Sequence, residues 1–252
     1  MGYISIIADD LTGASDTGIQ FCKYGLKTKV IVDHTKLEQF LDSDEILSIN
    51  SDTRSLKNKE AYKTVYDISH KLKKAGFSCI YKKIDSTLRG NPGIELEAVM
   101  DVFDSKLAIL APSFPDNGRY IINGYLKVGS ASINEKNSNV ENISSTDYME
   151  QKLCHVPTLL QADMKRKVAN IGLKTVREGC SEIISVVEDL YKKGYQVLTF
   201  DTATKDDLKT IALACKSLPK NTILSGTAGL AAYLPAALEL SSCKSIKPLS
   251  KN

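Results

Sequence analysis

Short apolar runs rich in β-branched residues alternate with longer amphipathic segments along most of this chain, and that order constrains the fold more than any other feature. Strands are predicted over residues 3–8, 28–32, 45–50, 77–84, 107–111, 168–171, 196–201 and 222–224. Helices are predicted over residues 13–24, 36–41, 59–75, 94–103, 146–153, 180–193, 205–218 and 226–240. Because such alternation builds parallel sheets with helices on both faces, we predict a three-layer α/β fold with a mostly parallel sheet.

The alternation is interrupted between residues 112 and 145, where Pro, Gly, Asn and Ser dominate. We predict a loop or hairpin excursion there, with a hairpin over 120–128 and an exposed loop over 134–145. The 252 residues, 42% of them hydrophobic, allow one large domain or two small ones. We assign residues 1–240 to one domain, with the interruption allowing a subdivision near 130–145, and residues 241–252 to a polar tail.

Composition and charge argue against several classes of protein. The net charge is only +3 and no basic stripe stands out, so nucleic acid is not an expected partner. No apolar run is long enough to span a bilayer, and the first residues lack the basic lead of a signal peptide. The six cysteines are scattered, which is typical of reduced thiols in a cytoplasmic protein. The three histidines are isolated, so we expect no metal site.

Four of the predicted strands run straight into segments crowded with acids, hydroxyls, amides and basic side chains. Ligands of open α/β sheets bind outside the carboxyl ends of the strands, so we expect these segments to line one crevice. The candidates are Asp9 and Asp10 after the first strand, Arg54 after the third, Lys83, Asp85, Ser86, Arg89 and Asn91 after the fourth, and Ser113, Asn117 and Arg119 after the fifth.

Asp9 and Asp10 directly follow the first predicted strand. Successive strand residues point to opposite faces, so we expect only one of the two carboxylates to face the crevice. A carboxylate there can bind a substrate hydroxyl and accept its proton. The alternative is that one of them caps the helix that starts near residue 12.

The basic residues of the crevice have a functional and a structural interpretation. Arg89 and Arg119 present planar forks that can hold a carboxylate through two hydrogen bonds, and Arg54 is a third candidate. Each arginine could instead form a surface ion pair of little energetic value. Lys82 and Lys83 end a buried strand, where an unpaired ammonium is costly, so at least one must find an acid or an anion.

The common nucleotide-binding motifs are absent from the sequence. No Gly-x-Gly-x-x-Gly follows the first strand, and no Gly-x-x-x-x-Gly-Lys-Ser/Thr occurs. Gly226 and Thr227 open the last predicted helix, where backbone amides can either hold an anion or simply cap the helix.

Four segments resemble the four-carbon acid sugar kinases. They are ADDLTGA at 8–14, KIDSTLRGN at 83–91, APSFPDNGR at 111–119 and GTAGLA at 226–231. Their order and spacing are similar to those of that family's N-terminal domain, and the resemblance covers nearly the whole chain.

The resemblance implies an ATP-dependent kinase that phosphorylates the terminal hydroxyl of threonate, erythronate or a 3-oxo-tetronate. It implies an N-terminal domain that holds the sugar acid and a C-terminal domain that holds the nucleotide. Matching the motifs carries over Asp9, Asp10, Asp85, Arg89, Asn91 and Arg119 as ligand-binding positions. Either Asp9 or Asp85 is then the expected catalytic carboxylate that orients or deprotonates the attacking hydroxyl.

The sequence departs from the family where the nucleotide domain would begin. We find no glycine-rich segment left to hold ATP, so we expect ATP and Mg²⁺ to be bound only by the full-length family arrangement, with the nucleotide domain in cis or on a second polypeptide. A homodimer is compatible with the sequence. Two alternatives stay open: a non-catalytic sugar-acid sensor, and an α/β enzyme that acts on a different phosphorylated ligand without ATP.

Overall fold

The computed structural model describes residues 4–129 and 154–240, and an eight-stranded parallel sheet organises this part of the chain. The strand order is β2-β3-β1-β4-β10-β5-β9-β8. The strands are β1 (Ile4–Ala8), β2 (Thr28–Ile31), β3 (Ile46–Asn50), β4 (Cys79–Lys83), β5 (Ala108–Ala111), β8 (Lys167–Ile171), β9 (Tyr195–Phe200) and β10 (Ile223–Gly226).

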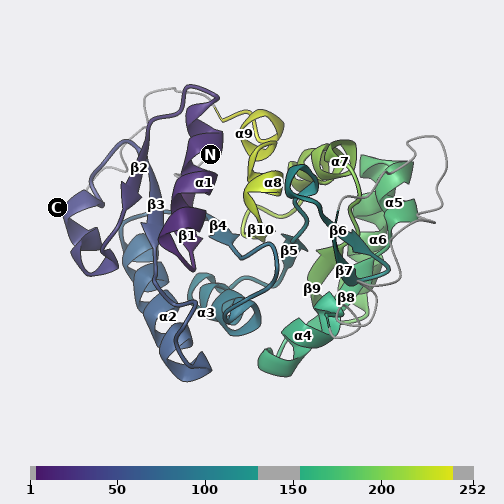
Figure 1. Cartoon of the computed structure of the whole chain (residues 1–252), viewed down its shortest axis with the longest axis horizontal. Helices are drawn as coiled ribbons and strands as arrows, with labels where there is room; N and C mark the ends of the chain where they lie inside the picture. Colours follow the sequence, from purple (N-terminus) through teal and green to yellow (C-terminus); the bar gives the residue numbers. More distant parts are fainter. Residues whose placement is uncertain (1–3, 130–153, 241–252) are drawn as a thin grey trace.

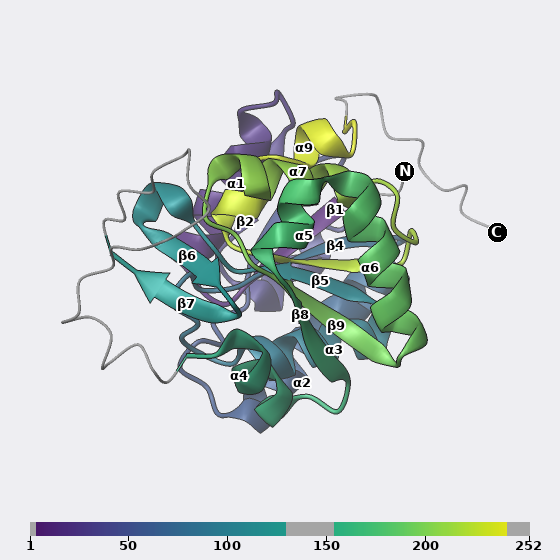
Figure 2. The ribbon, with the colours of Figure 1, turned by 90° about the vertical axis from the view of Figure 1, so that its right-hand side faces the viewer.

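Helices cover both faces of the sheet, as Figures 1 and 2 show. One face packs against η1 (His34–Phe40), α2 (Asn58–Lys74), α3 (Pro92–Phe103) and α4 (Val156–Asp163). The other face packs against α1 (Leu11–Cys22), α5 (Leu173–Glu178), α6 (Cys180–Lys192), α7 (Lys205–Cys215), α8 (Ala228–Ala231) and α9 (Leu234–Ala237). The predicted three-layer α/β fold is therefore confirmed.

The core follows from the periodicities of the sequence. Ile6 and Ile7 of β1 are both fully buried, and they belong to the two different hydrophobic clusters on either side of the sheet. This is the alternation expected of a strand covered on both faces. Helix α2 buries a stripe at helical spacing, namely Ala61, Val65, Ile68 and Leu72, and exposes its lysines.

The hairpin predicted between residues 120 and 128 is present as β6 (Arg119–Ile122) paired antiparallel with β7 (Tyr125–Val128). Asn123 and Gly124 form its turn with φ of 52° and 77°, the left-handed geometry that two-residue hairpin turns require. The buried carboxylate of Asp201, just after β9, accepts hydrogen bonds from both turn amides at 2.7 and 2.8 Å. This anchors the hairpin to the main sheet.

Some predicted boundaries were wrong. The helix expected over 226–240 is two short helices, α8 and α9, because Pro235 lacks an amide donor and starts a new helix instead of continuing the first. The last strand runs on to Gly226. Helices α4 and α5 were missed. The helix expected over 146–153 and the loop expected over 134–145 lie outside the described residues.

The topology creates the location for a ligand. Strand β1 lies between β3 and β4, and the helices that follow β1 and β3 lie on opposite faces of the sheet. Where the connections from neighbouring strands leave on opposite faces of the sheet, a crevice opens at the carboxyl ends of those strands. Within the described ranges, no helix is both long and apolar enough to cross a membrane.

Candidate functional site

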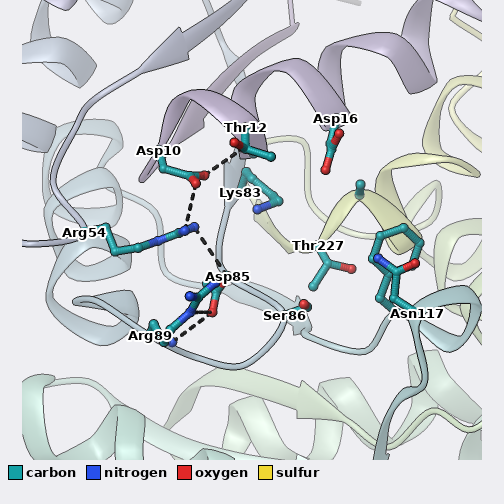
Figure 3. Close-up of a pocket in the computed structure, with 13 residues that line it drawn as sticks. Asp10, Thr12, Asp16, Arg54, Lys83, Asp85, Ser86, Arg89, Asn117 and Thr227 are labelled. Carbon is teal, nitrogen blue, oxygen red and sulfur yellow. Dashed lines mark hydrogen bonds and ion pairs between the residues drawn. The ribbon is translucent and has the colours of Figure 1, made fainter. Parts of the chain in front are cut away.

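A cavity of about 230 Å³ opens at the carboxyl edge of the central strands (Figure 3). This is smaller than the roughly 300–1,000 Å³ pockets that hold drug-sized ligands, so it suits a small molecule. Five segments of the described part of the chain line it. They are α1 with its N-cap (Asp10, Thr12, Gly13, Asp16), the segment after β3 (Arg54), the end of β4 with the loop that follows (Lys83, Asp85, Ser86, Arg89), η2 (Pro115–Asn117) with the residue before it (Asn117, Phe114), and the start of α8 with its N-cap (Thr227, Ala228).

Arg54 ties three carboxylates from two strand ends together. Its Nε donates to Asp9 Oδ2 at 2.7 Å, and its NH1 lies 2.7 Å from Asp10 Oδ2. Its NH2 lies 3.4 Å from Asp85 Oδ1. Burial alone would lower the pKa of Arg54, but these carboxylates raise it, so the guanidinium stays charged. Arg54 thus fixes the acids before any ligand arrives.

Asp85 organises the loop that follows β4. One oxygen accepts hydrogen bonds from the backbone amides of Thr87 and Arg89, both at 3.2 Å, and from the Thr87 hydroxyl. The fork of Arg89 donates to both carboxylate oxygens, at 2.8 and 2.9 Å. Such short-range bonds from an aspartate to the following backbone are typical of tight turns.

The charge state of Asp85 follows from these contacts. Burial by itself would raise the pKa of this carboxyl, but the hydrogen bonds from Arg89 and Thr87 and the charge of Arg54 outweigh it. The pKa of Asp85 is therefore held well below its usual range. A carboxylate with such a low pKa is a weak proton acceptor, and the contacts of Asp85 favour a positioning task.

Lys83 occupies the middle of the pocket (Figure 3). The residue is 6% exposed, and within the described ranges no hydrogen bond or ion pair reaches its ammonium. Burial lowers the pKa of Lys83, and the charges of Asp9 and Asp10 counteract this only in part. Gly13 makes room for it: a Cβ there would lie 2.6 Å from both Lys83 Nζ and Asp10 Oδ1.

The far side of the pocket is a network of buried hydroxyl groups around Thr227. Tyr81 donates to the carbonyl of Thr227 at 2.6 Å, and the Thr227 hydroxyl donates to the carbonyl of Ser113, also at 2.6 Å. Thr202 donates to the Ser113 hydroxyl. Gly226 is required here because a Cβ would lie 2.5 Å from the carbonyl oxygen of Ala111. This backbone is therefore held rigidly beside Lys83.

The structure brings together eight of the residues predicted from the sequence. Those that line the pocket are Asp10, Arg54, Lys83, Asp85, Ser86, Arg89, Asn117 and Thr227. Of the two adjacent aspartates, Asp10 lines the pocket, and it also caps α1 by accepting from the Gly13 amide at 2.8 Å. Capping and pocket lining thus fall to the same residue.

Five predicted residues lie outside the lining. Asp9 is buried behind Arg54. Asn91 donates to the carbonyls of Thr53 and Leu56, both at 2.9 Å, and so fastens two loops together. Arg119 donates to the carbonyl of Asn117. The remaining two, Ser113 and Gly226, hold the backbone around Thr227 as described above.

Five lining residues were not predicted: Thr12, Gly13, Asp16, Phe114 and Ala228. Helical spacing is the signal that would have found some of them. Thr12 and Asp16 are four residues apart on α1, so they share the helix face that starts at the capping Asp10. Asp16 differs from Asp10 and Asp85 because no hydrogen bond or ion pair of its carboxylate is found in the described part of the chain.

Comparison with known proteins identifies a family. The sequence profile of the sugar-binding N-terminal domain matches residues 4–234. A D-erythronate kinase of Heliobacterium modesticaldum is 34% identical over 215 residues, which are 84% of this chain and 48% of that protein. A D-threonate kinase of Salmonella typhimurium is 30% identical over 92% of this chain and 53% of that protein. A 3-oxo-tetronate kinase of Haemophilus influenzae is 29% identical, covering 93% and 56%.

Solved structures with the same fold agree with this. A Haemophilus influenzae protein superposes with a TM-score of 0.75 at 28% identity, covering 93% of this chain and 56% of that one. A Bordetella bronchiseptica protein, solved with bound citrate as a domain-swapped dimer, gives a TM-score of 0.73 at 29% identity, covering 94% and 56%. The chain spans about half the length of the curated relatives it matches.

Proposed function

This chain belongs to the sugar-binding N-terminal domain family of the four-carbon acid sugar kinases, and from this membership we propose that its pocket binds a four-carbon sugar acid. The acid we propose is threonate, erythronate or 3-oxo-tetronate, and the complete protein would phosphorylate its terminal hydroxyl with ATP. The names of the related kinases support this class of substrate.

The observation that carries the proposal is that the Lys83 ammonium has no hydrogen-bond or ion-pair partner among the residues that the structure describes. A buried charge without a partner is costly, and proteins keep one where a ligand of opposite charge completes the site. Arg54 and Arg89 are already bonded to aspartates, whereas the ammonium of Lys83 faces the cavity, and no such bond to it is found over residues 4–129 and 154–240. A carboxylate bound there would accept charge-assisted hydrogen bonds, which are the strong ones.

The rest of the lining suits a polyhydroxylated acid. Ser86 and Thr227 offer hydroxyl groups, Asn117 offers an amide, and Asp16 offers a carboxylate for which the described part of the chain holds no partner. These groups can donate to and accept from the several hydroxyls of a tetronate. Citrate in the Bordetella relative is likewise a small hydroxylated carboxylate, which supports the proposed class of ligand.

The described residues do not fit a site for ATP and Mg²⁺. They contain no group of three or more His, Cys, Asp or Glu side chains arranged to hold a metal ion. The pocket carboxylates Asp10 and Asp85 are bonded to arginines, and the cavity is small. We therefore propose that a nucleotide-binding domain, in cis or on a second polypeptide, supplies that part of the reaction.

Isothermal titration calorimetry tests the proposal. We expect D-erythronate or D-threonate to bind, and the neutral tetritol erythritol to bind at least about tenfold more weakly because it lacks the carboxylate. Lys174→Met replaces a highly exposed lysine outside the pocket, so this control variant should bind the tetronates like the wild type. Binding of ATP–Mg²⁺ in preference to every tetronate would overturn the proposal.

A second experiment separates a kinase from a sensor. Phosphoryl transfer to a tetronate should appear when a separately expressed nucleotide-binding domain of the family is added to this chain. Tetronate binding without any turnover in that mixture would favour the non-catalytic alternative.

A further inference from the structure

We propose that Asp16 accepts the hydrogen bond of the sugar acid's terminal hydroxyl, and that the acid lies with its carboxylate at Lys83 and its far end toward Asp16. This inference rests on the proposed function and adds the orientation of the ligand. It also assigns a specificity-determining task to a residue that was not among the sequence-based candidates.

The carboxylates that line the pocket differ in how far they are already bonded. Asp10 accepts a hydrogen bond from the Gly13 amide and pairs with an Arg54 nitrogen. Asp85 accepts two hydrogen bonds from the guanidinium of Arg89, so the oxygens of both aspartates are already engaged. Asp9 lies outside the lining. Among the described residues, Asp16 is the one lining carboxylate for which no bond within the protein is found.

Asp16 lies in the second turn of α1, whose first turn is fixed by the Asp10 cap, so a rigid element positions it. Thr12, one turn earlier on the same helix, also lines the pocket. Figure 3 shows Asp16 apart from the aspartate–arginine cluster, on the opposite side of Lys83 from Arg89.

Lys83 and Asp16 differ in exposure. Lys83 is buried in the pocket, whereas Asp16 is one of the exposed residues that line it. A hydroxyl that reacts with a second substrate must face the open side, and the anion must lie where the buried cation is. The two requirements give the same orientation of the ligand.

A cycle of two ligands and two proteins tests this contact. D-erythronate is compared by calorimetry with its 4-deoxy analogue, 2,3-dihydroxybutanoate, on the wild type and on Asp16→Ala, which removes the acceptor oxygens. Hydrogen bonds to charged groups lead us to expect that loss of the 4-hydroxyl weakens binding to the wild type roughly tenfold, but binding to Asp16→Ala by less than about twofold. The 2-deoxy analogue, 3,4-dihydroxybutanoate, should lose the same factor on both proteins.

Asp189→Ala, at a surface aspartate of α6, is the matched control and should give the wild-type pattern. An equal loss for the 4-deoxy analogue on wild type and Asp16→Ala overturns the inference while the proposed function stands. The inference is also overturned if the substitution of Asp16 changes the loss for the 2-deoxy analogue instead. Asp16 would then bind the 2-hydroxyl, and the ligand would lie in the opposite orientation. If the wild type binds no tetronate at all, the proposed function fails and this inference falls with it.

Discussion

Lys82 and Lys83 are consecutive residues of β4, but among the described residues only the Lys82 ammonium has a carboxylate partner. The Lys82 ammonium lies 2.6 Å from Glu95 Oε2 of α3, and both residues are almost completely buried. The Lys83 ammonium lines the pocket and has no carboxylate partner within residues 4–129 and 154–240. Because strand side chains alternate, one lysine serves the core and the other faces the ligand site.

Substitution of the two lysines should therefore have opposite effects on stability. We expect Lys83→Met to leave the free energy of unfolding unchanged or to raise it by about 1 kcal/mol, because a buried unpaired charge is removed. Lys82→Met should lower it by about 3–5 kcal/mol, because Glu95 is left buried without its partner. Urea unfolding of both variants measures this. A larger loss for Lys83→Met than for Lys82→Met would contradict the assignment.

The pH dependence of binding should also report on Lys83. Its folded-state pKa is lowered, chiefly by burial, so the ammonium loses its proton below the value near 10.4 of an unfolded lysine. Tetronate affinity should then fall as pH rises through this lowered pKa. Titrations between about pH 7 and 10 measure it, with Lys83→Met as the control that lacks this component.

The lowered pKa of Lys83 also makes the free energy of unfolding depend on pH. Below the folded-state pKa both states are charged, and the penalty of burying the ammonium is fully present. Between that pKa and the unfolded value the folded state releases its proton, so the penalty disappears and wild-type stability rises relative to Lys83→Met. A difference between the two proteins that does not vary with pH would speak against a buried, unpaired lysine.

Asp85→Asn should destabilise the protein by about 3 kcal/mol at neutral pH, because the buried loop amides and both arginines lose a charged acceptor. The pKa of Asp85 is lowered, so its stabilisation is present above the unfolded value of about 3.9 and is lost as pH falls through the folded-state pKa. Denaturant unfolding from pH 7 down to about 2 should show the wild-type advantage shrinking only at the acid end.

Gly226→Ala should be destabilising by about 2 kcal/mol and should also weaken tetronate binding, because the new Cβ would press on the carbonyl of Ala111 and the hydroxyl of Tyr81. Gly172→Ala is the control, since its Cβ would meet nothing nearer than 4.0 Å. Thermal unfolding and calorimetry of both variants check this. Equal behaviour of the two would show that the backbone at Thr227 has more room than the structure indicates.

The sequence was sufficient to predict the layers of the fold because burial imposes its periodicity on nearly every element. The Ala61-Val65-Ile68-Leu72 stripe could be recognised directly in the sequence. The 226–240 region was not predicted correctly because its apolar residues continue across Pro235, and the break depends on a missing amide rather than on hydrophobicity. Short helices such as α5 carry too few turns to show a period.

For the candidate site, the edge of the sheet could be predicted but the pairings could not. Strand order at the carboxyl ends follows from topology, and this placed Asp10, Arg54, Lys83 and Asp85 in one crevice. Which carboxylate an arginine binds depends on loop geometry that leaves no pattern in the chain. The fork of Arg89 was expected to hold the ligand, yet the structure shows it bonded to Asp85.

A crystal structure of this protein with D-erythronate would show directly where the acid binds. We expect the sugar acid in the cavity between β4 and α1, with its carboxylate within hydrogen-bonding distance of Lys83 Nζ. Density for the acid elsewhere on the molecule, or in the cavity with the carboxylate turned away from Lys83, would contradict this expectation.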